Sequence, residues 1–253
     1  MVVCITLFTP VSPKVKILIR VLLLAISIIA WRISIKRELS RAAVLAFSFI
    51  ALNLAFLIVT PFTAGFWNLD VNTSKGIALS KFSDSAIITV ALISSFLIAG
   101  YRLKSIYLTR GKLIPGIMIG IIFFIIFGYL ALTNPQQKPG TGFLEKNWMW
   151  IFVFVLSNGF MEELVFRGIF LDKLNLLFNH HLSILMTSVC FAVPHFIVQY
   201  QPNVLLFAGI CFVLGMICGY AMHLTRSIIA PALIHAGADL MIIVPIFATY
   251  GVK

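Results

Sequence analysis

Residues 113–132 read LIPGIMIGIIFFIIFGYLAL, twenty consecutive positions without a charged side chain. Spanning the hydrocarbon core of a bilayer as a helix takes about 20 mostly apolar residues, because every backbone N–H and C=O group must be satisfied within the segment. The stretch also lacks the alternating apolar and polar pattern of a barrel strand. It therefore predicts a transmembrane helix.

The rest of the chain repeats this pattern. Of its 253 residues, 61% are hydrophobic and 11% are charged, and the mean hydropathy is +1.07, so it has too little polar surface for a water-soluble globule. We expect an all-α fold, one transmembrane domain over residues 1–253, and an integral, multi-pass protein of the lipid bilayer, which in a bacterial cell is the plasma membrane. Hydropathy predicts about eight transmembrane helices, approximately at 15–33, 42–60, 84–100, 113–132, 148–171, 182–200, 203–223 and 227–248.

The charged residues mostly lie between these spans. The net charge of +11 comes from 19 Lys and Arg against eight Asp and Glu. This pattern is typical of anchoring at a membrane surface, and we expect no nucleic-acid partner. Two longer connections, around 61–83 and 133–147, contain Pro, Gly and Asn and are predicted to be loops. The four cysteines form no CxxC motif and are interpreted as buried thiols.

Three acidic residues lie inside apolar spans, namely Glu162, Glu163 and Asp239. A charge in such a position costs at least a few kcal/mol and calls for a functional reason. At about 1.5 Å per helical residue, Glu162 and His235 lie about 13 Å deep, and His195 and Asp239 about 20 Å. These depths straddle the middle of a core about 30 Å thick. We therefore expect the four side chains to meet in one cavity, with the catalytic helices within residues 148–248.

Spacing along the fifth span separates the two glutamates. Glu163 and Arg167 are four positions apart, on one helix face and within ion-pairing reach. Glu162 points about 100° away around the helix. We infer that Arg167 holds Glu163 as a structural pair and leaves Glu162 free to act on water. His195 can share that water, and Phe191, one turn earlier, can pack beside the imidazole.

Three motifs follow one another in this part of the chain. EELVFR at 162–167 fits EExxxR, FAVPH at 191–195 fits FxxxH, and HAGAD at 235–239 fits Hxxx(N/D). In these motifs the chain resembles the CPBP family of CAAX proteases and bacteriocin-processing enzymes, also called the Abi family, and is similar to its type II CAAX prenyl endopeptidases. The resemblance implies an eight-helix membrane fold and hydrolysis of a peptide bond by activated water.

The resemblance also implies roles for single residues. Glu162 and His195 would activate the water, with Glu163 in the catalytic set and Arg167 and Phe191 in support. His235 and the residue at 239 would stabilise the tetrahedral oxyanion. The family often has Asn at the last position, whereas an ionised aspartate accepts hydrogen bonds and cannot donate one to an oxyanion. Asp239 would therefore have to be protonated, or instead orient His235.

The sequence leaves the cofactor open between a divalent metal, such as zinc, and none. Glu162, His195 and His235 are the candidate metal ligands, and zinc would lower the pKa of a bound water to about 7. The chain has no HExxH motif, and the candidate ligands come from separate helices. The resembled family has been described both as metalloendopeptidases and as metal-independent glutamate proteases. We favour water activated directly by Glu162 and His195.

These observations together favour an intramembrane endopeptidase. Its substrate would be a membrane-presented peptide or protein, either of the prenylated CAAX type or similar to a bacteriocin or a signal peptide. Two alternatives stay open. One is a transporter or proton relay that uses the buried carboxylates. The other is a noncatalytic bacteriocin-immunity protein, against which the intact motif residues argue.

Overall fold

The structure is a computed structural model that describes residues 12–134, 139–196 and 203–250. Within these ranges all regular secondary structure is helical. The longer helices are α2 (Pro13–Lys36), α3 (Ser40–Val59), α4 (Ser74–Ile98), α5 (Leu113–Thr133), α6 (Phe143–Glu163), α8 (His180–Ala192), α9 (Val204–Thr225) and α10 (Ile229–Tyr250). The shorter ones are η1 (Leu103–Ile106), η2 (Leu164–Leu171), α7 (Asp172–Leu174) and η3 (Val193–Phe196).

Seven helical segments in the described ranges are long and apolar enough to cross a membrane. They correspond to seven of the eight predicted spans. The exception is the sixth span, where α8 and η3 end at Phe196 and the rest of the predicted range 182–200 lies outside the described residues. The all-α, polytopic fold is confirmed, and the chain is an integral, multi-pass membrane protein.

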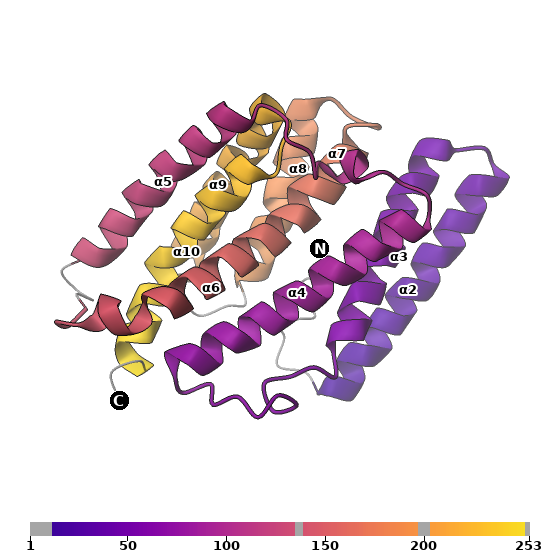
Figure 1. The fold of residues 1–253 in the computed structure, drawn as a ribbon. Coiled ribbons are helices and arrows are strands. Elements are labelled where there is room, and N and C mark those ends of the chain that lie inside the picture. The colour runs from indigo at the N-terminus through magenta and orange to yellow at the C-terminus, as the bar shows by residue number, and fades with distance from the viewer. Residues whose placement is uncertain (1–11, 135–138, 197–202, 251–253) are drawn as a thin grey trace.

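The helices pack so that α6 has a central position. Figure 1 shows α2 and α3 on one side of the bundle, α5, α9 and α10 on the other, and α4 and α6 between them. α6 packs on α4 and on α10, α3 packs on both α2 and α4, and α8 packs on α9. Side chains at the end of α6 can therefore reach helices from both halves of the bundle.

The third span begins ten residues earlier than the sequence predicts. α4 begins at Ser74 rather than near residue 84, so the second half of the predicted loop 61–83 is helical. The Thr73 side chain caps this helix by accepting a hydrogen bond of 3.0 Å from the Gly76 N–H group. Hydropathy missed this part because its Ser and Lys residues lower the average, although the cap favours a helix. Of the other predicted loop, 133–147, residues 135–138 lie outside the described ranges.

The fifth span continues for longer than predicted and changes its winding. The range 148–171 is part of one helical segment from Phe143 to Leu174. It is α-helical up to Glu163, and η2 then follows as a π-helix. π-Helical turns are rare and are frequent at functional sites, and the apolar periodicity of a sequence does not distinguish them from an α-helix. The change in winding begins directly after the two glutamates.

Candidate active site

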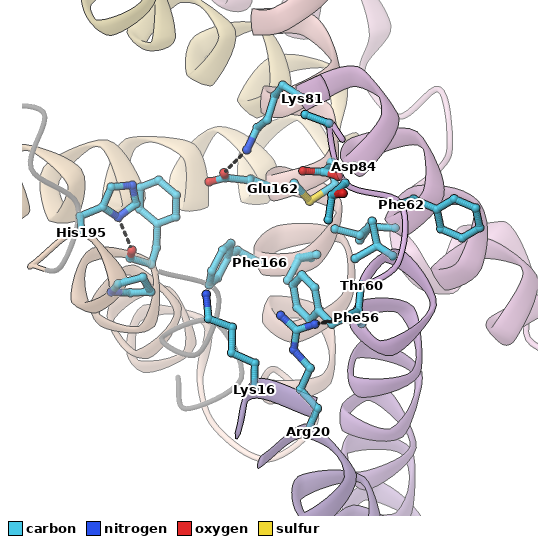
Figure 2. A pocket seen from close by; sticks show the side chains of 18 residues that line it. Lys16, Arg20, Phe56, Thr60, Phe62, Lys81, Asp84, Glu162, Phe166 and His195 are labelled. Carbon is cyan, nitrogen blue, oxygen red and sulfur yellow. Dashed lines mark hydrogen bonds and ion pairs between the residues drawn. The ribbon is translucent and has the colours of Figure 1, made fainter. Parts of the chain in front are cut away.

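A cavity of about 450 Å³ lies within the bundle, between α2, α3, α4, the α6–η2 segment and the α8–η3 segment. Its walls are largely apolar, with side chains such as Phe56, Ile88 and Phe166. Figure 2 shows the side chains around this cavity. Its charged and titratable lining residues are Lys16, Arg20, Lys81, Asp84, Glu162 and His195.

Glu162 presents its carboxylate to this cavity from the last turn of α6. Its side chain keeps 18% of its surface exposed, whereas the neighbouring Glu163 keeps none. The Glu162 Oε1 atom lies 3.9 Å from the Nζ atom of Lys81 on α4, and Oε2 lies 3.8 Å from the Nε2 atom of His235 on α10. Glu162 is therefore a partly exposed carboxylate with cationic or polar groups on two sides.

His195 reaches the same cavity from η3. Its Nδ1 atom lies 2.8 Å from the Phe191 carbonyl oxygen. A carbonyl oxygen can only accept a hydrogen bond, so Nδ1 carries the proton and Nε2 of the neutral ring keeps a lone pair. The Phe191 ring lies 4.9 Å from the imidazole ring between centroids, which confirms the predicted packing of these two side chains. The imidazole is thus held by Phe191, and its basic nitrogen makes no hydrogen bond to a residue that the structure describes.

Behind this wall, Glu163 and Arg167 form the predicted ion pair. Arg167 donates from Nη1 to the Glu163 Oε1 atom at 2.7 Å, and both side chains are fully buried. Arg167 also donates from Nη2 to the Gly215 carbonyl oxygen at 2.9 Å. The guanidinium carbon lies 4.9 Å from the centre of the Phe191 ring, at a distance typical of a cation–π contact. The pair therefore connects η2 to α8 and α9.

His235 and Asp239 also lie behind Glu162. The His235 Nδ1 atom donates to the Glu163 Oε1 atom at 2.7 Å, and its Nε2 atom lies 3.6 Å from the Asp239 Oδ1 atom. Asn158 donates from Nδ2 to the Asp239 Oδ2 atom at 2.8 Å. His235 is only 3% exposed, and neither His235 nor Asp239 lines the cavity. The expected convergence is thus found for Glu162, His235 and Asp239, since His235 lies within 3.8 Å of both carboxylates. Only Glu162 and His195 line the cavity, however, and the two residues of α10 lie behind its wall.

His235 and Asp239 lie behind the cavity wall because α10 closely approaches the buried side of α6. A Cβ atom at Gly159 would lie 2.9 Å from both the Ala232 carbonyl oxygen and the Ala236 amide nitrogen. With a glycine there, the backbones of α6 and α10 come together one turn before the glutamates. α10 therefore presents His235 to the face of α6 that carries Glu163, rather than to the cavity.

Five residues at this site were not predicted from the sequence. Asn158 donates a hydrogen bond to Asp239. In the sequence, only its position as a polar residue one turn before Glu162 could have indicated this role. The other four line the cavity from the N-terminal half of the chain. Lys81 was assigned to a loop, and basic residues near the start of α2 were taken for surface anchors. These four residues are Lys16, Arg20, Lys81 and Asp84.

The candidate metal ligands do not form a metal site. Glu162, His195 and His235 come from three helices, and of these three residues His235 does not line the cavity. Within residues 12–134, 139–196 and 203–250, no three His, Cys, Asp or Glu side chains are arranged to hold a metal ion. The described side chains therefore do not fit a metal ion, and they carry the proposed chemistry by themselves.

The fold and the site define a class: a polytopic membrane protein with a carboxylate and an imidazole in an internal cavity. Residues 144–241 match the sequence model of the family described as type II CAAX prenyl endopeptidase Rce1-like. This segment contains all three motifs, so the family resemblance of the motifs is confirmed over these residues. Over these residues the chain is thus similar to a family of prenyl endopeptidases. Comparison with curated proteins and with solved structures gives no match.

Proposed function

We propose that this protein is an intramembrane endopeptidase that hydrolyses a peptide bond of a membrane-presented substrate, with Glu162 and His195 activating the water. The observation that carries the proposal is that these two side chains line one cavity inside the bundle. Glu162 supplies an accessible carboxylate, and His195 supplies a ring nitrogen with a free lone pair. The family match over residues 144–241 supports the CAAX type of substrate, whose cleavage site lies close to the C-terminus.

The reaction needs a general base and then a general acid. Glu162 accepts a proton from water, and the hydroxide oxygen forms a bond to the carbonyl carbon of the scissile peptide. The tetrahedral intermediate then breaks its C–N bond as the proton on Glu162 passes to the leaving nitrogen. His195 accepts a hydrogen bond from the same water through Nε2, which orients the attacking oxygen. The largely apolar walls of the cavity reduce the water around these groups and so strengthen their interactions.

The buried groups behind Glu162 act as positioning residues in this proposal. His235 bridges Glu163 and Glu162 through its two ring nitrogens, at 2.7 Å and 3.8 Å. Asp239 accepts a hydrogen bond from Asn158. This bond uses Oδ2 as an acceptor, and Oδ1 lies 3.6 Å from His235 Nε2. The arrangement supports orientation of His235 rather than donation to an oxyanion. The oxyanion role that the resemblance implied for His235 would require this ring to reach the cavity.

Lys81 is our candidate for stabilising the oxyanion. Its ammonium group lies 3.9 Å from Glu162 Oε1, and its side chain is 26% exposed. Figure 2 shows this ammonium group beside the Glu162 carboxylate. A cation at this position faces the place where negative charge develops when hydroxide attacks the peptide carbonyl group. Lys81 is outside the matched segment, so this role rests on geometry alone.

The test uses protein purified into lipid nanodiscs and synthetic peptides that end in a CAAX sequence, with and without a prenyl group. Mass spectrometry of the products locates the cleaved bond. Glu162→Gln and His195→Asn are expected to abolish cleavage. Glu145→Gln is the matched control, since it makes the same change at an exposed position in the first turn of α6. Cleavage retained by both site variants would refute the proposal, and proton-coupled solute uptake without cleavage would favour a transporter.

A further inference from the structure

Helix α2 brings two basic side chains into the cavity. Lys16 and Arg20 are four positions apart, so they lie on one face of the helix, and both line the cavity. Arg20 is only 4% exposed, although it carries a permanent charge. Both residues lie outside the segment that matches the protease family. Neither takes part in the hydrolytic chemistry proposed for Glu162.

Among the described residues, Arg20 has no negative partner. It donates from Nη1 to the Phe56 carbonyl oxygen at 2.7 Å and to the Thr60 hydroxyl group, and both acceptors are neutral. Its Nε atom is buried and has no hydrogen-bond partner in the part of the chain that the structure describes. Within those same residues, no carboxylate lies at ion-pair distance from the guanidinium group. These neutral acceptors solvate part of the guanidinium group but leave its positive charge uncompensated, so an anion from outside would stabilise it.

The charges in the cavity are separated into two groups. Figure 2 shows Lys16 and Arg20 entering on one side of the cavity, in the lower half of the view. The upper half holds Lys81, Asp84, Glu162 and His195. The two acidic side chains of the lining thus lie on the side away from α2, and Phe56 and Phe166 contribute apolar surface to the same cavity. An anionic group of a ligand is therefore attracted to the α2 side.

We propose that Arg20 and Lys16 bind the C-terminal carboxylate of the peptide substrate. A planar guanidinium group matches the two oxygens of a carboxylate, and an ammonium group adds a second positive charge. The cavity, at about 450 Å³, has the size of a small-ligand pocket, which suits the end of a chain better than a continuous polypeptide. That a peptide bond near the C-terminus is cleaved rests on the proposed function. Binding of the C-terminal carboxylate can be tested without cleavage.

The test compares two peptides of the same CAAX sequence, one with a free C-terminal acid and one with a C-terminal amide. Binding is measured by fluorescence anisotropy on Glu162→Gln protein in phosphatidylcholine nanodiscs, so that cleavage does not interfere. We expect the acid to bind about tenfold more tightly or better, as expected for a charge-assisted contact. Adding Arg20→Gln should remove this preference. The amide in the peptide and the glutamine in the protein each delete the same interaction, so their effects on binding are not additive.

Three further variants keep the result interpretable. Arg20 also fastens α2 to α3, so Arg20→Gln can disturb the fold; Lys16→Gln leaves that contact intact and should reduce the preference for the acid. Arg20→Lys keeps the charge and should retain part of the preference. Lys14→Gln is the matched control, since it removes the same charge from an exposed position of α2 and should change nothing.

Several outcomes would overturn this inference. One is equal binding of acid and amide to the protein with Arg20 intact, and another is a preference for the acid that survives both Arg20→Gln and Lys16→Gln. A third is Arg20-dependent binding of phosphatidylglycerol with no dependence of peptide binding on Arg20, which would assign the site to a lipid phosphate. A preference for the acid in the binding assay, combined with no cleavage of any of these peptides by the unmodified protein, would refute the protease proposal alone.

Discussion

Replacing Arg167 by methionine is expected to destabilise the protein strongly. The Arg167 and Glu163 side chains are both fully buried, and their ion pair spans 2.7 Å. Methionine fills part of the space of the arginine stem. Among the described residues, Glu163 then keeps the hydrogen bond from His235 at Oε1, and its Oε2 atom has no hydrogen-bond partner. Breaking a buried pair by removing one member costs about 3–5 kcal/mol. We expect a loss of this size in the free energy of unfolding.

The measurement is unfolding of the purified protein by titration with sodium dodecyl sulfate in mixed micelles, followed by tryptophan fluorescence. The double variant Glu163→Gln, Arg167→Met removes the uncompensated carboxylate as well. It should be more stable than the sum of the two single changes predicts, by about 1–3 kcal/mol. Lys146→Met, an exposed position on α6, controls for the loss of a positive charge. A loss below about 1 kcal/mol for Arg167→Met, or additive effects in the double variant, would contradict the buried-pair interpretation.

Further expectations follow from the cavity and its walls. Lys81→Met should lower kcat by about tenfold to 100-fold with little change in KM, and Lys81→Arg should recover part of it; Lys75→Met, an exposed change on the same helix, should have no effect. Gly159→Val should cost about 1–3 kcal/mol in the same unfolding assay, because its Cβ atom meets the α10 backbone at 2.9 Å; unchanged stability would contradict the close approach. EDTA should leave peptide cleavage intact, and loss of activity that zinc restores would overturn direct activation of water by Glu162.

The membrane fold could be predicted almost completely from the sequence. Long apolar runs such as 113–132 are stable in lipid, because a helix satisfies its own backbone hydrogen bonds and the apolar side chains face hydrocarbon. In water, the same side chains would be exposed at a large cost in free energy. The largest error concerned the start of α4, where Lys81 and neighbouring serines lower the local hydropathy of a helix that begins at Ser74. Hydropathy averages over a window, so it places a helix end poorly where polar residues face the interior of a bundle.

The pairing of Glu163 with Arg167 could also be predicted, because a separation of four residues sets the reach of two side chains on one helix. The packing of Phe191 beside His195 follows from the same rule and is found at 4.9 Å. Both contacts are local in the chain. The separate roles of Glu162 and Glu163 likewise rest on the rotation between consecutive helical residues, and the structure places one in the cavity wall and the other behind it.

The sequence by itself determined the membrane class, the helices and the short-range contacts within them, because these depend on composition and on spacing along one helix. Only the tertiary structure decided which helices face each other. It separated His235 from the cavity through the approach of α10 to Gly159, and it brought Lys81 and Arg20 from the first half of the chain into the wall that holds Glu162. Contacts between distant helices depend on the packing of whole helix faces, and no local pattern of residues carries that information.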